Sequence, residues 1–320
     1  MLTRRFEIVW LVLLFLAGYV YSRVANAEPT FSAKHAYVVN LTTGEVVINK
    51  KQTDIVPIAS ITKLMTALVI VDSDLNLAEE ITIEKNDLEA TKESRRNLGL
   101  PVGSTYTREE LVLIALMSSN NRAAAALART HPAGYQGFVE LMNQKARELD
   151  MIDTSFVDPS GIFNNNVSTA EDLIKLLQAV KSRPTIGQFS TETSYKKQRE
   201  VTSKVKTRVE NKKTKKVEVR VSERTQTVTD YYGTTNRLLL TDDWNIHLQK
   251  TGFIRAAGFC VTMIINISGE DYAIVLLNAA SKQTRAIDAV KAKYWVEYRV
   301  VPTRQILTTL NPYKRAERGR

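Results

Sequence analysis

Apolar residues along this chain recur at two periods, and the two periods occupy different blocks of the sequence. Near the start, AYVVN and EVVINKK flank the turn-forming residues LTTG, which predicts a hairpin of two strands. Near the end, IHLQKTGF, GFCVTMIINI and DYAIVLLNA have the composition of three further strands. Strand-forming sequence therefore lies at both ends of the chain.

The blocks between these strands repeat at the helical period. In PIASITKLMTALV, apolar side chains follow Ile61 at the i, i+3, i+4 and i+7 spacing, which predicts a buried helix with Ser60 and Lys63 at its start. Thr107 and Glu110 predict a capping box for a second buried helix, TREELVLIALM. Further helices are predicted at SSNNRAAAALA, FVELMNQKARELDM, AEDLIKLLQAV and RAIDAVKAKYWVEYRV. This order predicts an α+β fold, an antiparallel sheet flanked by helices.

The basic charge of the chain is concentrated in one segment. The net charge is +10, and between Tyr195 and Val228 there are 12 Lys and Arg against 4 Glu, a surplus of 8. Valines alternate with these charges around the polar run ENKKTKK, which predicts a protruding basic hairpin at residues 195–228. We expect one face of this hairpin to pack through its valines while the other presents a cationic ribbon.

The first 27 residues have the features of an export signal. Arg4 and Arg5 precede an almost wholly apolar run, and an Ala-x-Ala site ends at Ala27. We expect a signal peptide at residues 1–27 and a protein of the periplasm or cell envelope. An uncleaved anchor remains an alternative, although the run is shorter than the ~20 residues of a membrane span. Export argues against nucleic acid as the partner of the basic hairpin and favours an anionic wall or membrane surface.

The rest of the chain predicts one domain at residues 28–301 and a polar, frayed tail at residues 302–320. The chain has one cysteine, Cys260, so no internal disulfide can form, and its apolar surroundings predict a buried, inert thiol. The three histidines have no cysteine or carboxylate beside them at ligand spacing. We therefore expect no metal site and no cofactor.

Three short motifs occur in a fixed order. They are Ser-x-x-Lys at Ser60 to Lys63, Ser-x-Asn at Ser119 to Asn121, and Lys-Thr-Gly at Lys250 to Gly252. A lone Ser-x-x-Lys arises by chance and also fits a capping serine beside a solvent-exposed lysine. The three together indicate the serine chemistry of penicillin-binding proteins and class A β-lactamases.

The first motif has the spacing of a nucleophile and its base. Residues three apart share a helix face, so Lys63 can take the proton of Ser60 as the hydroxyl attacks a carbonyl. A lysine does this near pH 7 only if burial or a neighbouring cation lowers its pKa, and Lys250 is a candidate neighbour. The backbone N–H of Ser60, at the start of a helix, is free to join an oxyanion hole.

The second motif can be read in two registers. Ser118 and Asn120 fit it as well as Ser119 and Asn121 do. We prefer Ser119 and Asn121, because Arg122 then leads into the alanine-rich helix as in the family motif. A break between two helices is a place where a loop can direct polar side chains into a cleft.

The third motif lies in a predicted strand. Gly252 carries no side chain, which lets a ligand lie against the backbone as an added edge strand. In that arrangement Lys250 and Thr251 face the carboxylate of the ligand. A solvent-exposed lysine before a bulge is the alternative.

With these motifs, the chain resembles the low-molecular-mass penicillin-binding proteins, which are serine D-alanyl-D-alanine carboxypeptidases and endopeptidases of bacterial cell walls. The resemblance runs from about His35 to Val301 and includes PIASITKLMTA, VDPSGIFNNNVSTAEDL and QKTGF. It is strongest toward the endopeptidase branch. It implies a β-lactamase or transpeptidase-like fold, peptidoglycan stem peptides as substrates and β-lactam antibiotics as covalent inhibitors.

The resemblance also implies roles for single residues. Ser60 is the nucleophile, Lys63 the base, Ser119 the proton relay to the leaving amine, and Asn121 a ligand of the substrate backbone. Lys250 and Thr251 bind carboxylate, and Gly252 lies beside them in the motif. The oxyanion hole uses the backbone N–H groups of Ser60 and Phe253.

Other functions remain open at this stage. The middle motif is SNN rather than the SGN of many carboxypeptidases, and we find no carboxy-terminal β-domain such as many carboxypeptidases carry. We therefore expect a D-alanyl-D-alanine endopeptidase. A D-alanyl-D-alanine carboxypeptidase is the alternative. A class A β-lactamase needs an E-x-x-L-N loop, which we do not find between Asn121 and Lys250. A non-catalytic peptidoglycan-binding protein is the alternative of another class.

Overall fold

The computed structural model describes residues 28–90, 100–210 and 217–313. Within them a five-stranded antiparallel sheet runs in the order β2-β1-β11-β10-β9. Its strands are β1 (His35–Asn40), β2 (Val46–Lys50), β9 (Ile246–Ile254), β10 (Gly258–Ile267) and β11 (Glu270–Ala279). Val38 pairs with Ile274, so the strands from the two ends of the chain form one sheet.

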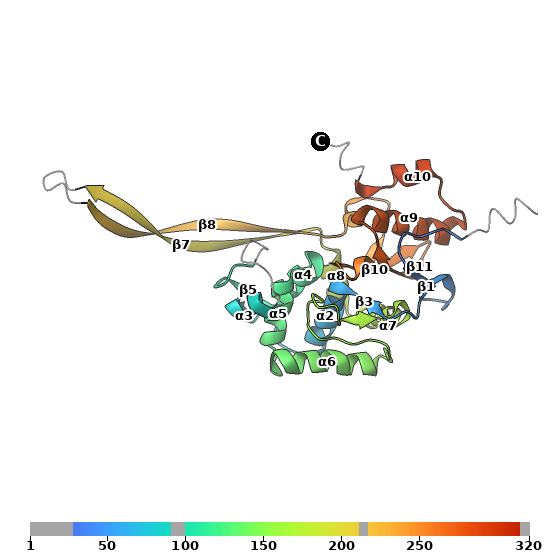
Figure 1. Ribbon diagram of the computed structural model, residues 1–320, viewed down its shortest axis with the longest axis horizontal. Coiled ribbons are helices and arrows are strands. Elements are labelled where there is room, and N and C mark those ends of the chain that lie inside the picture. The colour runs from blue at the N-terminus through green and yellow to red at the C-terminus, as the bar shows by residue number, and fades with distance from the viewer. Residues whose placement is uncertain (1–27, 91–99, 211–216, 314–320) are drawn as a thin grey trace, which may run out of the picture.

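Helices cover both faces of this sheet (Figure 1). On one face lie α9 (Lys282–Tyr298) and, beyond it, α10 (Arg304–Thr309). On the other lie η1 (Ala59–Thr62), α2 (Lys63–Asp72), α4 (Arg108–Met117), α5 (Asn121–Arg129), α6 (Gly134–Glu148), α7 (Ala170–Lys181) and α8 (Pro184–Thr191). The predicted α+β architecture is confirmed.

The remaining elements are short, except for one hairpin. They are β3 (Val56–Pro57), β4 (Glu80–Thr82), α3 (Lys85–Ala90), β5 (Thr105–Thr107), β6 (Val167–Ser168) and η2 (Arg237–Leu240). The long strands β7 (Ser194–Glu210) and β8 (Val217–Gly233) form the hairpin.

Burial on both faces explains why the central strands read as nearly continuous apolar runs. In β10, Cys260 and Ile264 face the core beneath α2 and α7, whereas Val261, Met263 and Ile265 face the core beneath α9. Burial raises the pKa of the Cys260 thiol to about 11, so this cysteine is inert, as expected.

Helix α2 is the central helix of the larger core. All of its residues from Lys63 to Ile70 are buried, as expected for a helix that is apolar on every side. Ser60 and Lys63 lie at its start, as expected: residues 59–62 form a 3₁₀ turn, and the α-helix begins at Lys63. Ala59 has a positive φ of 50°, a conformation that an α-helix cannot contain.

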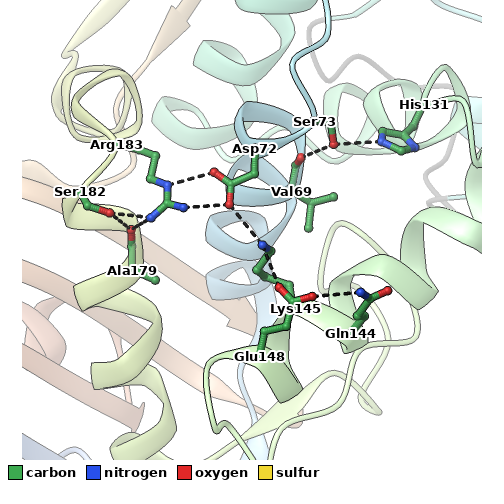
Figure 2. A network of polar contacts seen from close by, with 10 residues as sticks. All are labelled: Val69, Asp72, Ser73, His131, Gln144, Lys145, Glu148, Ala179, Ser182 and Arg183. Carbon is green, nitrogen blue, oxygen red and sulfur yellow. Dashed lines mark hydrogen bonds and ion pairs between the residues drawn. The ribbon is translucent and has the colours of Figure 1, made fainter.

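A network of polar contacts fixes the far end of α2 (Figure 2). The Asp72 carboxylate accepts two hydrogen bonds of 2.9 Å from Arg183 and lies 3.3 Å from the Lys145 ammonium. Next to it, the Ser73 hydroxyl donates to the Val69 carbonyl and contacts His131. The helix that carries Lys63 at its start is therefore tied at its end to α6, to the α5–α6 loop and to the chain just before α8.

The capping box predicted at Thr107 and Glu110 is confirmed. Thr107 Oγ1 accepts from the Glu110 N–H at 3.1 Å, and Glu110 Oε2 accepts from the Thr107 N–H at 2.8 Å. Two of the four free N–H groups at the start of α4 are thereby satisfied.

The predicted frayed tail was wrong up to Tyr313. Thr303 caps α10, which packs on α9, and Pro302, Asn311 and Pro312 are buried. Apolar and proline residues spaced among the basic ones let this segment cover part of α9. Residues 314–320 lie outside the described residues.

The basic hairpin protrudes far from the body of the molecule (Figure 1). Its strands pair without interruption from Ser194–Gly233 to Glu210–Val217. The expectation that its valines pack was wrong, because Val205 and Val221 are 40% and 55% exposed. A two-stranded ribbon beyond the domain has no second layer to bury its apolar face.

Candidate active site

A cleft of about 540 Å³ lies where β9 meets η1 and the start of α5. Six of the eight predicted site residues line it, namely Ser60, Ser119, Asn121, Thr251, Gly252 and Phe253. The other two, Lys63 and Lys250, are fully buried behind the cleft. A second cavity, of about 430 Å³ between α9 and α10, contains none of the predicted residues.

Lys63 connects the first two motifs. Its Nζ lies 3.0 Å from Ser60 Oγ, 2.7 Å from Asn121 Oδ1 and 2.6 Å from the Ser160 carbonyl oxygen. The 3₁₀ turn places Ser60 at the cleft and Lys63 one turn further into the core. The spacing of three residues thus puts a hydroxyl and a desolvated amine in direct contact.

The Ser160 carbonyl is held by a loop for which we predicted no site role. The buried Asp158 carboxylate accepts from the N–H groups of Ser160 at 2.7 Å and Gly161 at 2.8 Å, and also from Phe163 and Asn166. A Cβ on Gly161, whose φ is 76°, would lie 1.9 Å from the Ala59 carbonyl oxygen. Only glycine fits there. The Asp-Pro-Ser-Gly turn in the sequence is the signal that could have found this loop.

The two registers of the second motif have different roles in the structure. Ser118 Oγ donates to the Ile114 carbonyl at the end of α4, and Asn120 Oδ1 accepts from the Ala123 N–H at the start of α5. Ser118 and Asn120 are therefore capping residues. Ser119 and Asn121 line the cleft, and Ser119 has a positive φ of 61°, a strained conformation typical of functional sites.

Lys250 is a fully buried lysine with a perturbed pKa. Burial lowers its pKa well below the usual value, and the nearby charges of Lys63 and Arg285 lower it further. Its Nζ donates to the Thr251 carbonyl at 3.0 Å. Arg285, on α9, lines the cleft and donates to the Cys260 carbonyl at 3.2 Å. No spacing in the sequence relates Arg285 to the three motifs, so we missed it.

Gly252 brings the β9 strand against η1. A Cβ at this position would lie 2.8 Å from the Ile58 carbonyl oxygen and 3.2 Å from the Ser60 nitrogen. The space that we reserved for a ligand is thus occupied by the backbone before the serine. The neighbouring Phe253 is 53% exposed and stacks on Phe259, with ring centres 4.2 Å apart, so together they form an aromatic wall.

Among the described residues, no three His, Cys, Asp or Glu side chains gather as a metal ion would require. In the same part of the chain, no helix is long and apolar enough to cross a bilayer.

An antiparallel sheet flanked by helices, with a cleft that sets a serine against a buried lysine, is the arrangement expected of penicillin-binding proteins and class A β-lactamases. The family described as D-alanyl-D-alanine carboxypeptidase matches residues 22–227. The D-alanyl-D-alanine endopeptidase of Escherichia coli is 38% identical over 272 residues, which are 85% of this chain and 79% of that protein. The D-alanyl-D-alanine endopeptidase of Pseudomonas aeruginosa is 36% identical over 303 residues, 92% of this chain and 89% of that protein.

A solved structure is similar to this chain in fold. The Streptomyces K15 DD-transpeptidase superposes with a TM-score of 0.68 at 26% identity, and the match covers 84% of this chain and 98% of that one. The chain therefore belongs to the D-alanyl-D-alanine carboxypeptidase family, and it is a hydrolase. The predicted family, fold and enzyme class are confirmed.

Proposed function

We propose that this protein is a D-alanyl-D-alanine endopeptidase that cuts peptidoglycan cross-links through an acyl-enzyme on Ser60. The observation that carries the proposal is the contact between Ser60 Oγ and the buried amine of Lys63. A serine hydroxyl is a weak nucleophile unless an adjacent base takes its proton.

The Lys63 Nζ contacts three oxygen atoms, which are Ser60 Oγ at 3.0 Å, Asn121 Oδ1 at 2.7 Å and the Ser160 carbonyl oxygen at 2.6 Å. These contacts hold the amine against the hydroxyl whose proton it takes. The Ser60 oxygen attacks the D-alanyl carbonyl carbon while its proton passes to Lys63. When the C–N bond breaks, Ser119 relays that proton to the leaving amine. Water then hydrolyses the ester and regenerates Ser60.

Two groups of donors stabilise the charges of this reaction. The backbone N–H groups of Ser60 and Phe253 form the oxyanion hole, which the close approach of Gly252 to η1 supports. The carboxylate on the amine side of the bond binds Thr251 and Arg285 at the cleft wall. Lys250 lies fully buried behind that wall, where burial lowers its pKa well below the usual value.

Endopeptidase activity is favoured over carboxypeptidase activity by the names of the two relatives with 38% and 36% identity. The family description names the carboxypeptidase reaction, which is therefore the second candidate. The test is digestion of purified cross-linked muropeptide dimers and of monomeric pentapeptide, followed by mass analysis. We expect monomers to be released from dimers faster than D-alanine from pentapeptide, and the reverse order would favour a carboxypeptidase.

Two further properties follow from the same proposal. A β-lactam should acylate Ser60 and remain bound, because its strained amide offers the carbonyl that Ser60 attacks.

The residues 1–27, which lie outside the described residues, should direct export to the periplasm or cell envelope. The mass of the protein from an envelope fraction should correspond to a chain beginning at Glu28. An intact residue 1 would instead indicate an uncleaved anchor.

We also propose that the basic hairpin binds an anionic surface of the wall or membrane. At its base the charges are paired, since Lys197 binds Glu110 at 2.7 Å and Arg199 binds Asp230 at 2.6 Å. Tyr106 and Tyr232 share a hydrogen bond of 2.9 Å at the same place, so the base is anchored to the domain. Further out the side chains are exposed, which leaves their charge for a polyanion.

The lysines 212, 213, 215 and 216, which the sequence pattern singles out, lie outside the described residues, so the test uses exposed cations of the strands. Lys204, Arg208 and Arg224 are replaced together by Ser, and binding to purified sacculi is measured by pelleting across a salt series. We expect weaker pelleting at low salt and unchanged cleavage of soluble muropeptides. Pelleting equal to the parent at every salt concentration would refute wall binding.

A further inference from the structure

The active-site cleft is also lined by residues outside the three motifs. They are Arg237 of η2, Lys282 at the start of α9 and Tyr313 after α10. These three residues come from separate segments of the chain. The acylation chemistry does not use their side chains.

Arg237 is held in place by the contacts of the two residues that precede it. The preceding Asn236 caps η2 through a 3.2 Å hydrogen bond from the Leu238 N–H. Thr235 contacts Thr251 of β9 at 2.6 Å through their hydroxyl groups, and its N–H donates to the Met117 carbonyl at 3.2 Å. The position of Arg237 is therefore fixed relative to the carboxylate-binding strand.

The guanidinium group of Arg237 is also oriented. Its central carbon lies 4.7 Å from the ring centre of Tyr313, whose own N–H donates to Asn311 Oδ1 at 3.0 Å. Stacking occupies the face of a guanidinium and leaves its edge N–H groups available as donors. The fold of residues 302–313 onto α9 supplies this support.

The charge around Arg237 is not balanced by protein groups. Within the described residues, neither Arg237 nor Lys282 forms an ion pair, and no Asp or Glu is among the residues lining the cleft. Arg285 adds a third cation in the same cleft. An oriented arginine and a lysine with no acidic partner at the rim of a substrate cleft are suited to a second carboxylate.

We propose that Arg237, assisted by Lys282, binds the carboxylate that ends the amine-side stem peptide of a cross-linked dimer. This inference rests on the proposed endopeptidase function. Thr251 and Arg285 take the carboxylate next to the bond that is cut, and a dimer carries a second one further along the leaving stem. A terminal D-alanine has no such extension, so the subsite favours dimers over pentapeptide.

The test compares Arg237→Gln with the parent on two synthetic dimers, whose amine-side stem ends in a free carboxylate or in a carboxamide. Each kcat/KM is divided by the rate of acylation by benzylpenicillin, which reports an intact Ser60 site and a folded protein. Loss of a charge-assisted hydrogen bond should lower this ratio about tenfold for the free carboxylate. For the carboxamide, parent and variant should be equal.

Two further variants complete the design. Arg147→Gln makes the same change on an exposed arginine of α6 and should behave as the parent on both dimers. Arg237→Lys keeps the charge and should recover part of the preference for the free carboxylate. If the parent cuts dimers and Arg237→Gln cuts the free-carboxylate dimer as well as the parent does, the subsite alone is refuted. A parent that is acylated by benzylpenicillin yet cuts no dimer refutes the endopeptidase proposal and the subsite with it.

Discussion

The cleft and the hairpin use the same basic residue types in opposite environments. Lys63 and Lys250 are fully buried, and their amines lie among hydroxyl, amide and carbonyl groups. Lys204 and Arg224 of the hairpin are exposed along a ribbon that leaves the domain. Burial disfavours the charged form of an amine and makes proton transfer possible, whereas exposure keeps the charge and limits it to screened attraction.

The comparison teaches that the number of basic residues in a segment is a poor guide to its chemistry. The hairpin segment holds 8 of the 10 surplus charges. The reactive cations are single residues in apolar stretches, and they are recognised by what surrounds them. Substitution of a buried cation of the cleft should therefore affect the reaction far more than substitution of exposed cations of the hairpin.

Lys63→Met should lower the rate of acylation by a fluorescent penicillin by about 10²- to 10⁴-fold, because removal of a positioned base costs that much. The methionine preserves most of the buried volume. Lys85→Met, the same change on a lysine whose side chain is 71% exposed, is the control and should acylate at the parent rate. A Lys63→Met rate close to the parent would show that Ser60 does not depend on this amine.

Two adjacent serines give a sharper test within the cleft. Ser119→Ala should lower muropeptide turnover about 100-fold, since the proton relay to the leaving amine is lost. Ser118→Ala removes only a hydroxyl that donates to the Ile114 carbonyl, so turnover should be retained. The measurement is kcat on a soluble dimer for both variants. Loss of turnover in Ser118→Ala but not in Ser119→Ala would reverse the assigned register.

Lys250→Met should stabilise the fold in a manner that depends on pH. Because burial and neighbouring cations lower the pKa of Lys250, the unfolded chain binds its proton more tightly than the folded one below the usual pKa of 10.5. The cost to folding grows as the pH falls from 10.5 and becomes constant below the folded pKa. The variant should therefore gain stability over the parent at pH 7 and gain less at pH 10.

Urea denaturation of parent and Lys250→Met at both pH values measures this difference. The variant should at the same time lose acylation activity, since the Lys250 amine that donates to the Thr251 carbonyl behind the cleft wall is gone. A gain that is equal at pH 7 and pH 10 would mean that Lys250 is protonated to the same extent in the folded and unfolded chains.

The smallest effect is expected in the hairpin. Replacing Lys204, Arg208 and Arg224 by Ser should leave both the urea midpoint and the penicillin acylation rate unchanged, because these side chains are exposed and make no part of the core. Both quantities are measured beside Lys250→Met in one series. A loss of acylation in this variant would indicate that the hairpin acts on the cleft. It would contradict the separation between the buried cations of the cleft and the exposed cations of the hairpin.

Much of the fold was predictable because its signals are local. The strand segments, the buried helices and the capping box at Thr107 follow from periodicity and from residue types that cap helices. The 3₁₀ turn before Lys63 was not, because it depends on the positive φ of Ala59 and on the contact with Gly161. The packing of residues 302–313 likewise depends on a tertiary surface on α9.

The candidate site was predictable where its residues fall in short motifs. The residues that support it are separated in sequence and become neighbours only through the fold. Asp158 holds the loop behind Lys63, Arg285 approaches from α9, and Arg237 follows the long hairpin. The spacing of residues cannot report such neighbours, since each distance depends on the packing of several elements.

The most direct test of the central claim is the position of a penicillin adduct. Protein incubated with benzylpenicillin is digested and mapped by mass spectrometry, with Ser60→Ala as the matched variant. Ser60→Ala should fold normally, because the Ser60 side chain caps no helix end. A single adduct on the peptide that contains Ser60, absent from Ser60→Ala, is the result that we predict. An adduct on another residue, or one that persists in Ser60→Ala, would contradict the account.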